Sequence, residues 1–405
     1  RDTMAKFSEK FFCPAPWTML YYHANSPSPC HYIKNLESSM TPAEYINSDW
    51  LKQMKQDMLS GTAPSACSGC KTKEDMGLKS TRGAIWNYYN IGPEPEYEDQ
   101  WFANKFTADS PTVPTRIELR FSNLCNMKCR MCDETSSSSF AAEKIQHNIK
   151  PDKVGSHIEH SVIPIVKTEQ NSIEGLKDSA FLASVGKVCL TGGEPFLIKE
   201  YYDYLDHLID NGFNKNIDIE LYTNCSVYNP LFVDRLSKFR TVQMVMSIDA
   251  VGKSAEYIRS GTDWPKVESN ILKLNQLSSP FKMEVTTAIS AYSLMDFAET
   301  AKFLMRLYNE NNSIGVKCYN VTSPPGMHFN NLPKQLRSQA IEQIDKAVET
   351  LTAPNYLVLV TELLTVKQAL VELTPHTPMA FFDYTKKYDV IRGESFTEVF
   401  SKQTK

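Results

Sequence analysis

The chain has 405 residues, of which 42% are hydrophobic and 22% are charged, a composition typical of globular proteins and neither disordered nor fibrous. Its formal net charge of -4 supplies no overall attraction to phosphate backbones or anionic lipids, which argues against nucleic acid as the main partner. It has no run of about eighteen apolar residues, and residues 1–10 lack the apolar centre of a secretion signal, so we expect a cytoplasmic protein without a membrane segment.

The first part of the chain carries four of the ten cysteines, Cys13, Cys30, Cys67 and Cys70. A cytoplasm keeps thiols reduced, so these cysteines are expected to be ligands or core thiols rather than partners in disulfides. A helix is predicted over 41–59, before the Cys-x2-Cys pair. On spacing alone, four thiolates can close a tetrahedral zinc site.

Two proline-rich stretches follow, at 91–100 and 110–114, and predict a domain boundary near residue 112. After it, short β-type runs alternate with helical ones, the pattern of parallel βα units. The six predicted strands are 116–122, 187–191, 217–223, 242–248, 283–289 and 315–321. Helices are predicted over 199–211, 230–239, 267–277 and 293–308.

Six parallel strands with helices outside predict an α/β fold, a partial six-stranded (β/α)6 version of the eight-stranded barrel. Residues 133–186 exceed what one crossover needs and predict a helix with an irregular insertion. From residue 323 the strand pattern stops, and helices over 336–351 and 361–373 predict a small C-terminal cap. The predicted domains are therefore 1–112, 113–322 and 323–405.

The loop after the first predicted strand carries Cys-x3-Cys-x2-Cys, formed by Cys125, Cys129 and Cys132. Three thiolates this close together can bind three irons of one cubic 4Fe-4S cluster and leave the fourth iron open. A zinc knuckle is the alternative, but zinc needs four ligands, and the next His or Cys is His147.

A second motif, Thr191-Gly192-Gly193-Glu194-Pro195, ends the second predicted strand. Glycines let a ligand approach the backbone, and the Glu194 carboxylate can pair with an ammonium group. On the fourth strand, the apolar residues from Val242 to Ile248 alternate with others, which places Ser247 and Asp249 together on the opposite face.

These motifs together resemble the radical S-adenosylmethionine (SAM) superfamily, whose signature is this cysteine spacing after the first barrel strand. The resemblance implies that Gly192, Gly193 and Glu194 receive the SAM amino group. It further implies polar contacts to SAM from four residues at later strand ends, and a carboxylate contact from the arginine after the fourth strand; these residues are Thr223, Asn224, Ser247, Asp249 and Arg259. Family members carry an aromatic residue against adenine where this chain has Met131, which is polarizable enough to cover a purine.

The N-terminal cysteines resemble the twitch or SPASM type of accessory module, in which a hairpin and a later Cys-x2-Cys pair hold a second 4Fe-4S cluster. Zinc is the alternative metal. Such modules are usually C-terminal, whereas this one is N-terminal. Asn25 replaces the usual glycine of the hairpin, and asparagine tolerates the positive φ of a turn.

Four residues are candidates for contact with substrate. Glu118 and Arg120 alternate with apolar neighbours on the first strand and are expected to point into the barrel, as is Tyr319 on the last strand. Cys318 is a candidate hydrogen-atom donor, although a lone cysteine on a strand is more often a small core residue.

The resemblance implies reductive cleavage of SAM to a 5′-deoxyadenosyl radical, which abstracts hydrogen from a substrate. We expect a peptide or protein side chain as substrate, with a small metabolite or RNA as alternatives. The expected electron donor is a low-potential flavodoxin or ferredoxin. A non-catalytic zinc-binding interaction protein, or a member that binds a cluster and SAM without turnover, are the alternatives to an active enzyme.

Overall fold

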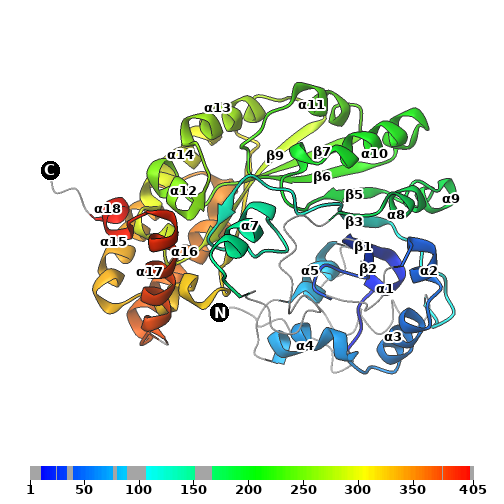
Figure 1. Cartoon of the computed structure of the whole chain (residues 1–405), viewed down its shortest axis with the longest axis horizontal. Helices are drawn as coiled ribbons and strands as arrows, with labels where there is room; N and C mark the ends of the chain where they lie inside the picture. Colours follow the sequence, from blue (N-terminus) through cyan, green and yellow to red (C-terminus); the bar gives the residue numbers. More distant parts are fainter. Residues whose placement is uncertain are drawn as a thin grey trace. The chain divides into compact units, whose positions relative to one another are not determined.

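The computed structural model describes residues 11–23, 25–33, 40–75, 80–88, 106–150, 167–375 and 377–401. Within them the chain forms two compact units. Unit 1 comprises residues 1–122, 167–190 and 203–218, and unit 2 comprises residues 123–166, 191–202 and 219–405. Figure 1 shows the course of the chain. The predicted domain limits at 112 and 322 stay predictions, because each unit is built from separate segments.

The fold is α/β, and its central strands are mostly parallel. Unit 1 carries four strands in the order β5-β3-β1-β2, namely β1 Met19–His23, β2 Ser26–Ser28, β3 Arg116–Arg120 and β5 Lys187–Leu190. Unit 2 carries four strands in the order β10-β9-β7-β6, namely β6 Asp218–Thr223, β7 Thr241–Ser247, β9 Phe281–Ile289 and β10 Gly315–Asn320. A separate two-stranded sheet in unit 2 pairs β4 Lys128–Cys129 with β8 Arg259–Ser260.

All six predicted strands are present, as β3, β5, β6, β7, β9 and β10. The hairpin of β1 and β2 adds to them, and β1 lies parallel to β3 with Tyr21 opposite Glu118. Asn25 makes the hairpin turn with a φ of 66°, which confirms the predicted positive φ. The size of the barrel stays a prediction.

The described helices of unit 1 surround the N-terminal cysteines and the edge of the sheet. They are α1 Ala15–Thr18, α2 Pro42–Ile46, α3 Asp49–Leu59, α4 Ser68–Asp75, α5 Thr81–Tyr88, α8 Gln170–Gly175 and α9 Ser179–Leu182, with 3-10 turns η1 Ser65–Cys67 and η3 Phe213–Lys215. The single helix predicted over 41–59 is two helices, because Ser48 is extended and caps α3 by accepting a hydrogen bond from Leu51 N. The proline-rich stretch at 91–100 lies outside the described residues.

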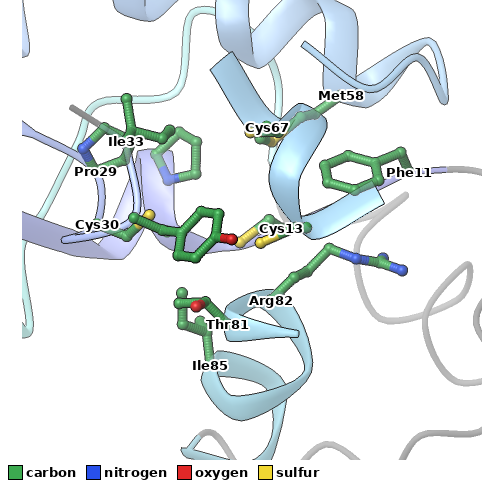
Figure 2. Close-up of a pocket in the computed structure, with 14 residues that line it drawn as sticks. Phe11, Cys13, Pro29, Cys30, Ile33, Met58, Cys67, Thr81, Arg82 and Ile85 are labelled. Carbon is green, nitrogen blue, oxygen red and sulfur yellow. The ribbon is translucent and has the colours of Figure 1, made fainter. Parts of the chain in front are cut away.

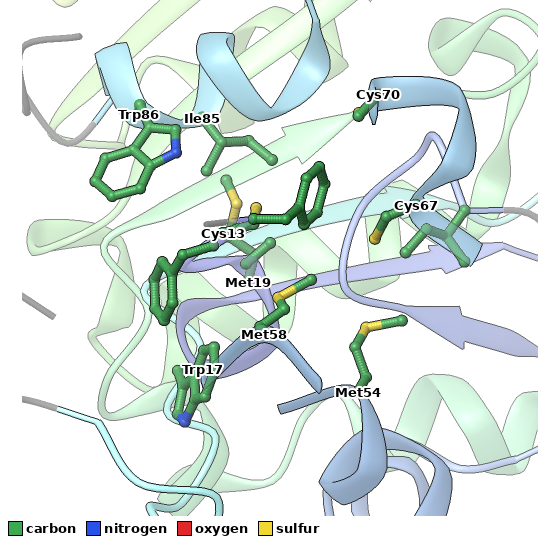
Figure 3. Close-up of a cluster of buried hydrophobic side chains, with 13 residues drawn as sticks. Cys13, Trp17, Met19, Met54, Met58, Cys67, Cys70, Ile85 and Trp86 are labelled. Atoms are coloured by element: carbon green, nitrogen blue, oxygen red, sulfur yellow. The ribbon is translucent and has the colours of Figure 1, made fainter. Parts of the chain in front are cut away.

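An aromatic and sulfur-rich core fills unit 1 around the cysteines (Figure 3). Trp17 is 1% exposed and stacks on Phe12 with ring centroids 5.3 Å apart. Met54 and Met58, four residues apart on α3, present their side chains to the same core. The N-terminal cysteines therefore pack against largely apolar side chains.

Unit 2 contains most of the remaining helices. They are α7 Ser138–Gln146, α11 Pro230–Leu236, α12 Gly252–Ile258, α13 Trp264–Asn275, α14 Phe297–Glu310, α15 Lys334–Thr350, α16 Leu357–Glu372, α17 Pro378–Arg392 and α18 Phe396–Phe400. Its 3-10 turns are η2 Pro195–Leu197, η4 Ser293–Met295, η5 Pro325–Met327, η6 Phe329–Asn331 and η7 Pro354–Tyr356, and α10 Lys199–Asp210 has residues in both units.

Local sequence explains where these helices begin and which face they bury. Asp263 caps α13 by accepting a hydrogen bond from Lys266 N, and Val267, Ile271 and Leu274 are spaced to form one buried face. The two predicted cap helices are confirmed as α15 and α16, and α17 and α18 follow them (Figure 1). No described helix is long and apolar enough to cross a membrane.

Candidate functional site

The loop with the three clustered cysteines lies in unit 2 and is held by its own serines. Ser137 Oγ donates to Met127 O at 2.6 Å, and Ser139 Oγ donates to Cys125 O at 2.6 Å. Cys129 lies on β4 opposite Arg259 on β8, so pairing of the two short strands brings that arginine to the loop. The Ser-rich start of α7 thus has a structural role in shaping the cysteine loop.

The three thiols have different electrostatic surroundings. Burial raises the pKa of Cys125 to about 12, whereas a hydrogen bond from Cys132 and the charge of Arg259 lower the pKa of Cys129 to about 7. Arg259 Nη1 lies 3.8 Å from Cys129 Sγ. Asn224 Nδ2 lies 3.6 Å from Cys125 Sγ. Two polar side chains from other elements therefore donate to sulfur atoms of this loop.

Gly193 packs against the same loop. A Cβ at residue 193 would lie 2.0 Å from Leu124 O, and Glu194 N donates to that oxygen at 2.8 Å. Gly261 is similarly close, since a Cβ there would lie 2.9 Å from Asn126 O. The sequence suggested that ligand access explains the glycine at 193, but the closest neighbour is the chain's own backbone. Gly192 has a φ of 120°, which favours glycine for conformational reasons.

Glu194 connects two of the predicted binding segments. Its carboxylate accepts hydrogen bonds from Asn224 N at 2.7 Å and Thr223 Oγ1 at 2.8 Å. Phe196 N is a third donor, at 3.3 Å. Burial raises the pKa of Glu194 to about 7, against the effect of these donors. A carboxylate has about four acceptor positions, so one is left for a further donor such as an ammonium group.

Asp249 and Arg259 form an ion pair of 2.7 Å, with 1% and 13% of the side chains exposed. The other Asp249 oxygen accepts a hydrogen bond from Ala288 N at 2.8 Å. The two residues expected to contact SAM independently are thus partners of each other. Met131 and Ser247 are half-buried residues of the same unit.

The candidate substrate residues divide between the units. Tyr319 is 51% exposed, yet burial of its hydroxyl end raises its pKa, and Asp249 acts in the same direction. Cys318 is a half-buried cysteine of β10 in unit 2. Glu118 and Arg120 belong to unit 1.

The N-terminal cysteines, Cys13, Cys30, Cys67 and Cys70, all line one small pocket of about 20 Å³ in unit 1 (Figure 2). The four cysteines come from different segments. Cys13 lies just before α1, Cys30 lies in the turn after β2, Cys67 ends η1, and Cys70 lies in α4. The sequence predicted that these four cysteines form one metal site, and in the structure all four line the same pocket. No described residues form the tight group of three or more ligand side chains around one point that a single metal ion requires.

Backbone N–H groups point at these thiols. Burial raises the pKa of Cys13, and Ala15 N opposes this by donating to it. Cys30 has a pKa raised to about 11 by burial, opposed by donors at Ile33 and Tyr32. Hydrogen bonds to sulfur are a common feature of both iron-sulfur and zinc thiolate sites.

Arg82 closes one side of this pocket and is 2% exposed. It forms an ion pair of 2.7 Å with Glu74 and donates to Phe12 O at 2.9 Å. The arginine therefore joins the segment after the Cys-x2-Cys pair to the segment that carries Cys13.

Arg130, between the second and third clustered cysteines, was not predicted as a site residue. It is fully buried, pairs with Asp389 at 2.8 Å and Glu394 at 2.6 Å, and lies over the Tyr257 ring. Its two carboxylate partners are more than 250 residues away in the chain, so no local pattern indicates them.

Residues 119–304 match the sequence model of the Radical SAM superfamily. That family implies a 4Fe-4S cluster and SAM. The cysteine loop fits such a cluster, because it supplies three thiols, no histidine, and side-chain donors to two of the sulfur atoms. The comparison with curated protein sequences gives no match.

Several solved structures are similar at low identity. The structure titled native anSMEcpe with bound AdoMet is 17% identical over 69% of this chain and 67% of that chain, with a TM-score of 0.40. Streptococcus suis SuiB bound to precursor peptide SuiA is 12% identical over 82% of this chain and 69% of that chain, with a TM-score of 0.35. The chain spans about two thirds of the first of these proteins. Similarities this low do not identify a substrate.

Proposed function

We propose that this chain, a radical SAM enzyme by its superfamily domain, cleaves SAM reductively and abstracts a hydrogen atom from a peptide or protein side chain. The observation that carries the proposal is the loop of Cys125, Cys129 and Cys132, whose thiols receive donors from Asn224 and Arg259. When bound, the cluster supplies the electron that splits SAM into methionine and a 5′-deoxyadenosyl radical.

The chain's own residues position the reactants. Glu194 orders the turn at Thr223 and Asn224 and retains an acceptor position for the SAM ammonium group. Arg259 is held by Asp249, and its guanidinium has further donors available for the SAM carboxylate. Gly192, Ser247 and Met131 complete the proposed SAM site. Tyr319 is proposed to face the substrate, because it is half exposed and electrostatically coupled to Asp249.

The N-terminal cysteines are proposed to hold a second 4Fe-4S cluster, with zinc as the alternative. Four thiols line one pocket, and three of them, Cys13, Cys30 and Cys70, receive backbone donors, which supports a metal centre of either kind. Iron is favoured because the chain also carries the radical SAM loop. If all four thiols ligate, no iron is open to substrate, so the centre would relay electrons or hold structure.

A peptide is favoured as substrate by the resemblance of the N-terminal cysteines to the accessory modules of radical SAM enzymes. A small metabolite is the alternative. The electron donor is proposed to be a low-potential flavodoxin or ferredoxin, on the same resemblance. The oxidoreductase, transferase or isomerase class of the reaction is open.

The test is formation of 5′-deoxyadenosine, measured by mass spectrometry after anaerobic reconstitution and addition of SAM and dithionite. The wild type is expected to form it, and the Cys125→Ala/Cys129→Ala/Cys132→Ala variant is expected to form none. Cys189→Ala is the control, since Cys189 is a buried cysteine outside both groups of candidate ligands. No 5′-deoxyadenosine from any of the three proteins would overturn the proposal.

A further inference from the structure

Unit 1 carries a polar face at the carboxyl ends of two parallel strands. Tyr21 lies opposite Glu118, and His23 lies opposite Arg120, because β1 and β3 pair in that register. His23 and Arg120 are the last residues of their strands. In parallel α/β sheets, ligands bind at this edge of the strands.

The two faces of these strands differ sharply. Leu20, Tyr22, Ile117 and Leu119 are at most 1% exposed and form the core face. The polar residues that alternate with them are only half-buried, namely Tyr21, His23, Arg116, Glu118 and Arg120. A polar face that stays half-buried is accessible to a ligand and also partly shielded from water.

Arg120 has a buried donor without an acceptor. Its Nε is buried, and no described residue accepts a hydrogen bond from it. Burial raises the pKa of Tyr21, while the charge of Arg120 and a hydrogen bond between the two side chains act to lower it. The guanidinium is therefore placed beside Tyr21 with an unused, partly desolvated N–H group.

The charges on this face favour an anion. Arg116 and Arg120 stand against one carboxylate, Glu118, which is already engaged because His31 Nδ1 lies 3.4 Å from its Oε2. Burial acts to raise the pKa of Glu118, but His31, Arg116 and Arg120 lower it, so this carboxylate is ionised and is already surrounded by cationic groups.

We propose that Arg120, flanked by Tyr21, binds a carboxylate of the substrate at the carboxyl ends of β1 and β3. A guanidinium binds a carboxylate through two parallel N–H donors, and the free Nε is one donor of such a pair. The site uses residues of unit 1, whereas the three-cysteine loop belongs to unit 2, and it gives Arg120 a role in binding rather than in hydrogen transfer. It rests on the proposed function only in assigning the carboxylate to a peptide, as a side chain or a C-terminus.

Binding of three small probes to the full-length protein tests this site without SAM or reductant. N-acetylglutamate α-amide carries a side-chain carboxylate, N-acetylglycine carries a C-terminal one, and N-acetylglutamine α-amide is the neutral match. Saturation-transfer NMR titrations at constant ionic strength measure each affinity. At least one carboxylate probe should bind about tenfold or more tightly than the neutral probe, the factor expected for one charge-assisted hydrogen bond. The carboxylate probe that binds identifies the source of the carboxylate.

Three variants locate the binding. Arg120→Gln should reduce the affinity of the carboxylate probe to that of the neutral one. Arg120→Lys should weaken binding several-fold, because it keeps the positive charge and loses the paired N–H donors of the guanidinium. If Arg120→Gln does not fold, the affinity of Arg120→Lys tests the site in its place. Arg116→Gln is the matched control, since it removes the same charge at the other end of β3 and should change affinity by less than about threefold.

Equal binding of charged and neutral probes would overturn the site, as would equal losses in Arg116→Gln and Arg120→Gln. Tighter binding of inorganic phosphate than of both carboxylate probes would overturn the choice of a carboxylate. Failure of the proposed function would be seen separately, as the absence of 5′-deoxyadenosine from wild-type protein.

Discussion

Asn224 is the residue that links the cysteine loop most closely to the turn after β6. Its Nδ2 lies 3.6 Å from Cys125 Sγ, its Oδ1 accepts from Ser226 N at 2.8 Å, and its own N–H is bound by Glu194. Three interactions from one side chain and its backbone fix the direction of a donor to sulfur. The sequence predicted Asn224 as a contact of SAM, and the structure adds this contact to a cysteine.

The first prediction concerns the Asn224 side chain. A donor to sulfur stabilises the reduced, more negative cluster, so Asn224→Ala should lower the cluster's midpoint potential by about 20–60 mV, the equivalent of one hydrogen bond. Potentiometric EPR titration measures it. Asn312→Ala, an exposed asparagine, is the control. An unchanged potential in Asn224→Ala would show that the contact with Cys125 does not act on the cluster.

Lys55 gives a prediction of pH dependence away from both cysteine sets. It is 4% exposed and donates to Ser110 O at 2.8 Å, and burial lowers its pKa to about 8. Because the unfolded lysine has a higher pKa, the unfolded state binds more protons between these values, and the protein loses stability as pH falls from about 10.5 to about 8.

The comparison of wild type with Lys55→Met isolates this effect. Between pH 7 and pH 10, the wild type should gain on the order of 2 kcal/mol of unfolding free energy relative to the variant. Denaturant titrations at several pH values measure the difference. A difference that does not change with pH would contradict the lowered pKa.

At the scale of elements, α17 supports the cysteine loop from within unit 2. Arg130 is fully buried between Asp389 and Glu394 and lies 3.9 Å from the Tyr257 ring centroid. Tyr384 Oη donates to Arg130 O. Helix α17, which the sequence did not predict, is thus part of what holds Arg130 in the cysteine loop.

Removal of that ion pair gives the third prediction. Arg130→Met leaves two carboxylates near a buried position, and should cost roughly 3–5 kcal/mol and reduce iron retention at the three-cysteine loop. Iron content after gel filtration and thermal denaturation measure the two effects. Lys386→Met, an exposed charge removal on the same helix, should change neither. Full iron retention and unchanged stability in Arg130→Met would refute the role of α17.

At the scale of the whole molecule, regular sequence patterns located the strands, whereas contacts between residues distant in the chain could not be predicted. Alternation and βα repetition located all six strands, and residue chemistry predicted the positive φ of Asn25. The break at Ser48 was missed because its cap outweighs the helical periodicity around it. The parallel pairing of β1 with β3 also has no local signal, since the two strands are about a hundred residues apart.

The candidate site follows the same division. Spacing grouped both cysteine sets, but not the partners of Arg259, Glu194 or Arg130, because those interactions join residues brought together only by the tertiary structure. The motif pointed to Gly193, but the sequence did not show why glycine is needed there. The reason is that a Cβ at this position would clash with the backbone of Leu124. The twitch or SPASM type of the N-terminal module and its metal stay predictions.

The most direct test of the central claim is iron and sulfide content with EPR on anaerobically reconstituted wild type and on the Cys125→Ala/Cys129→Ala/Cys132→Ala variant. About eight irons falling to about four, with loss of the EPR signal that SAM perturbs, is the predicted result for two cubic clusters. About four falling to none would keep the radical SAM cluster and assign the N-terminal cysteines to zinc or structure. No iron in either protein, or the same iron and the same SAM-sensitive signal in both, would contradict the assignment of the cluster to these three cysteines.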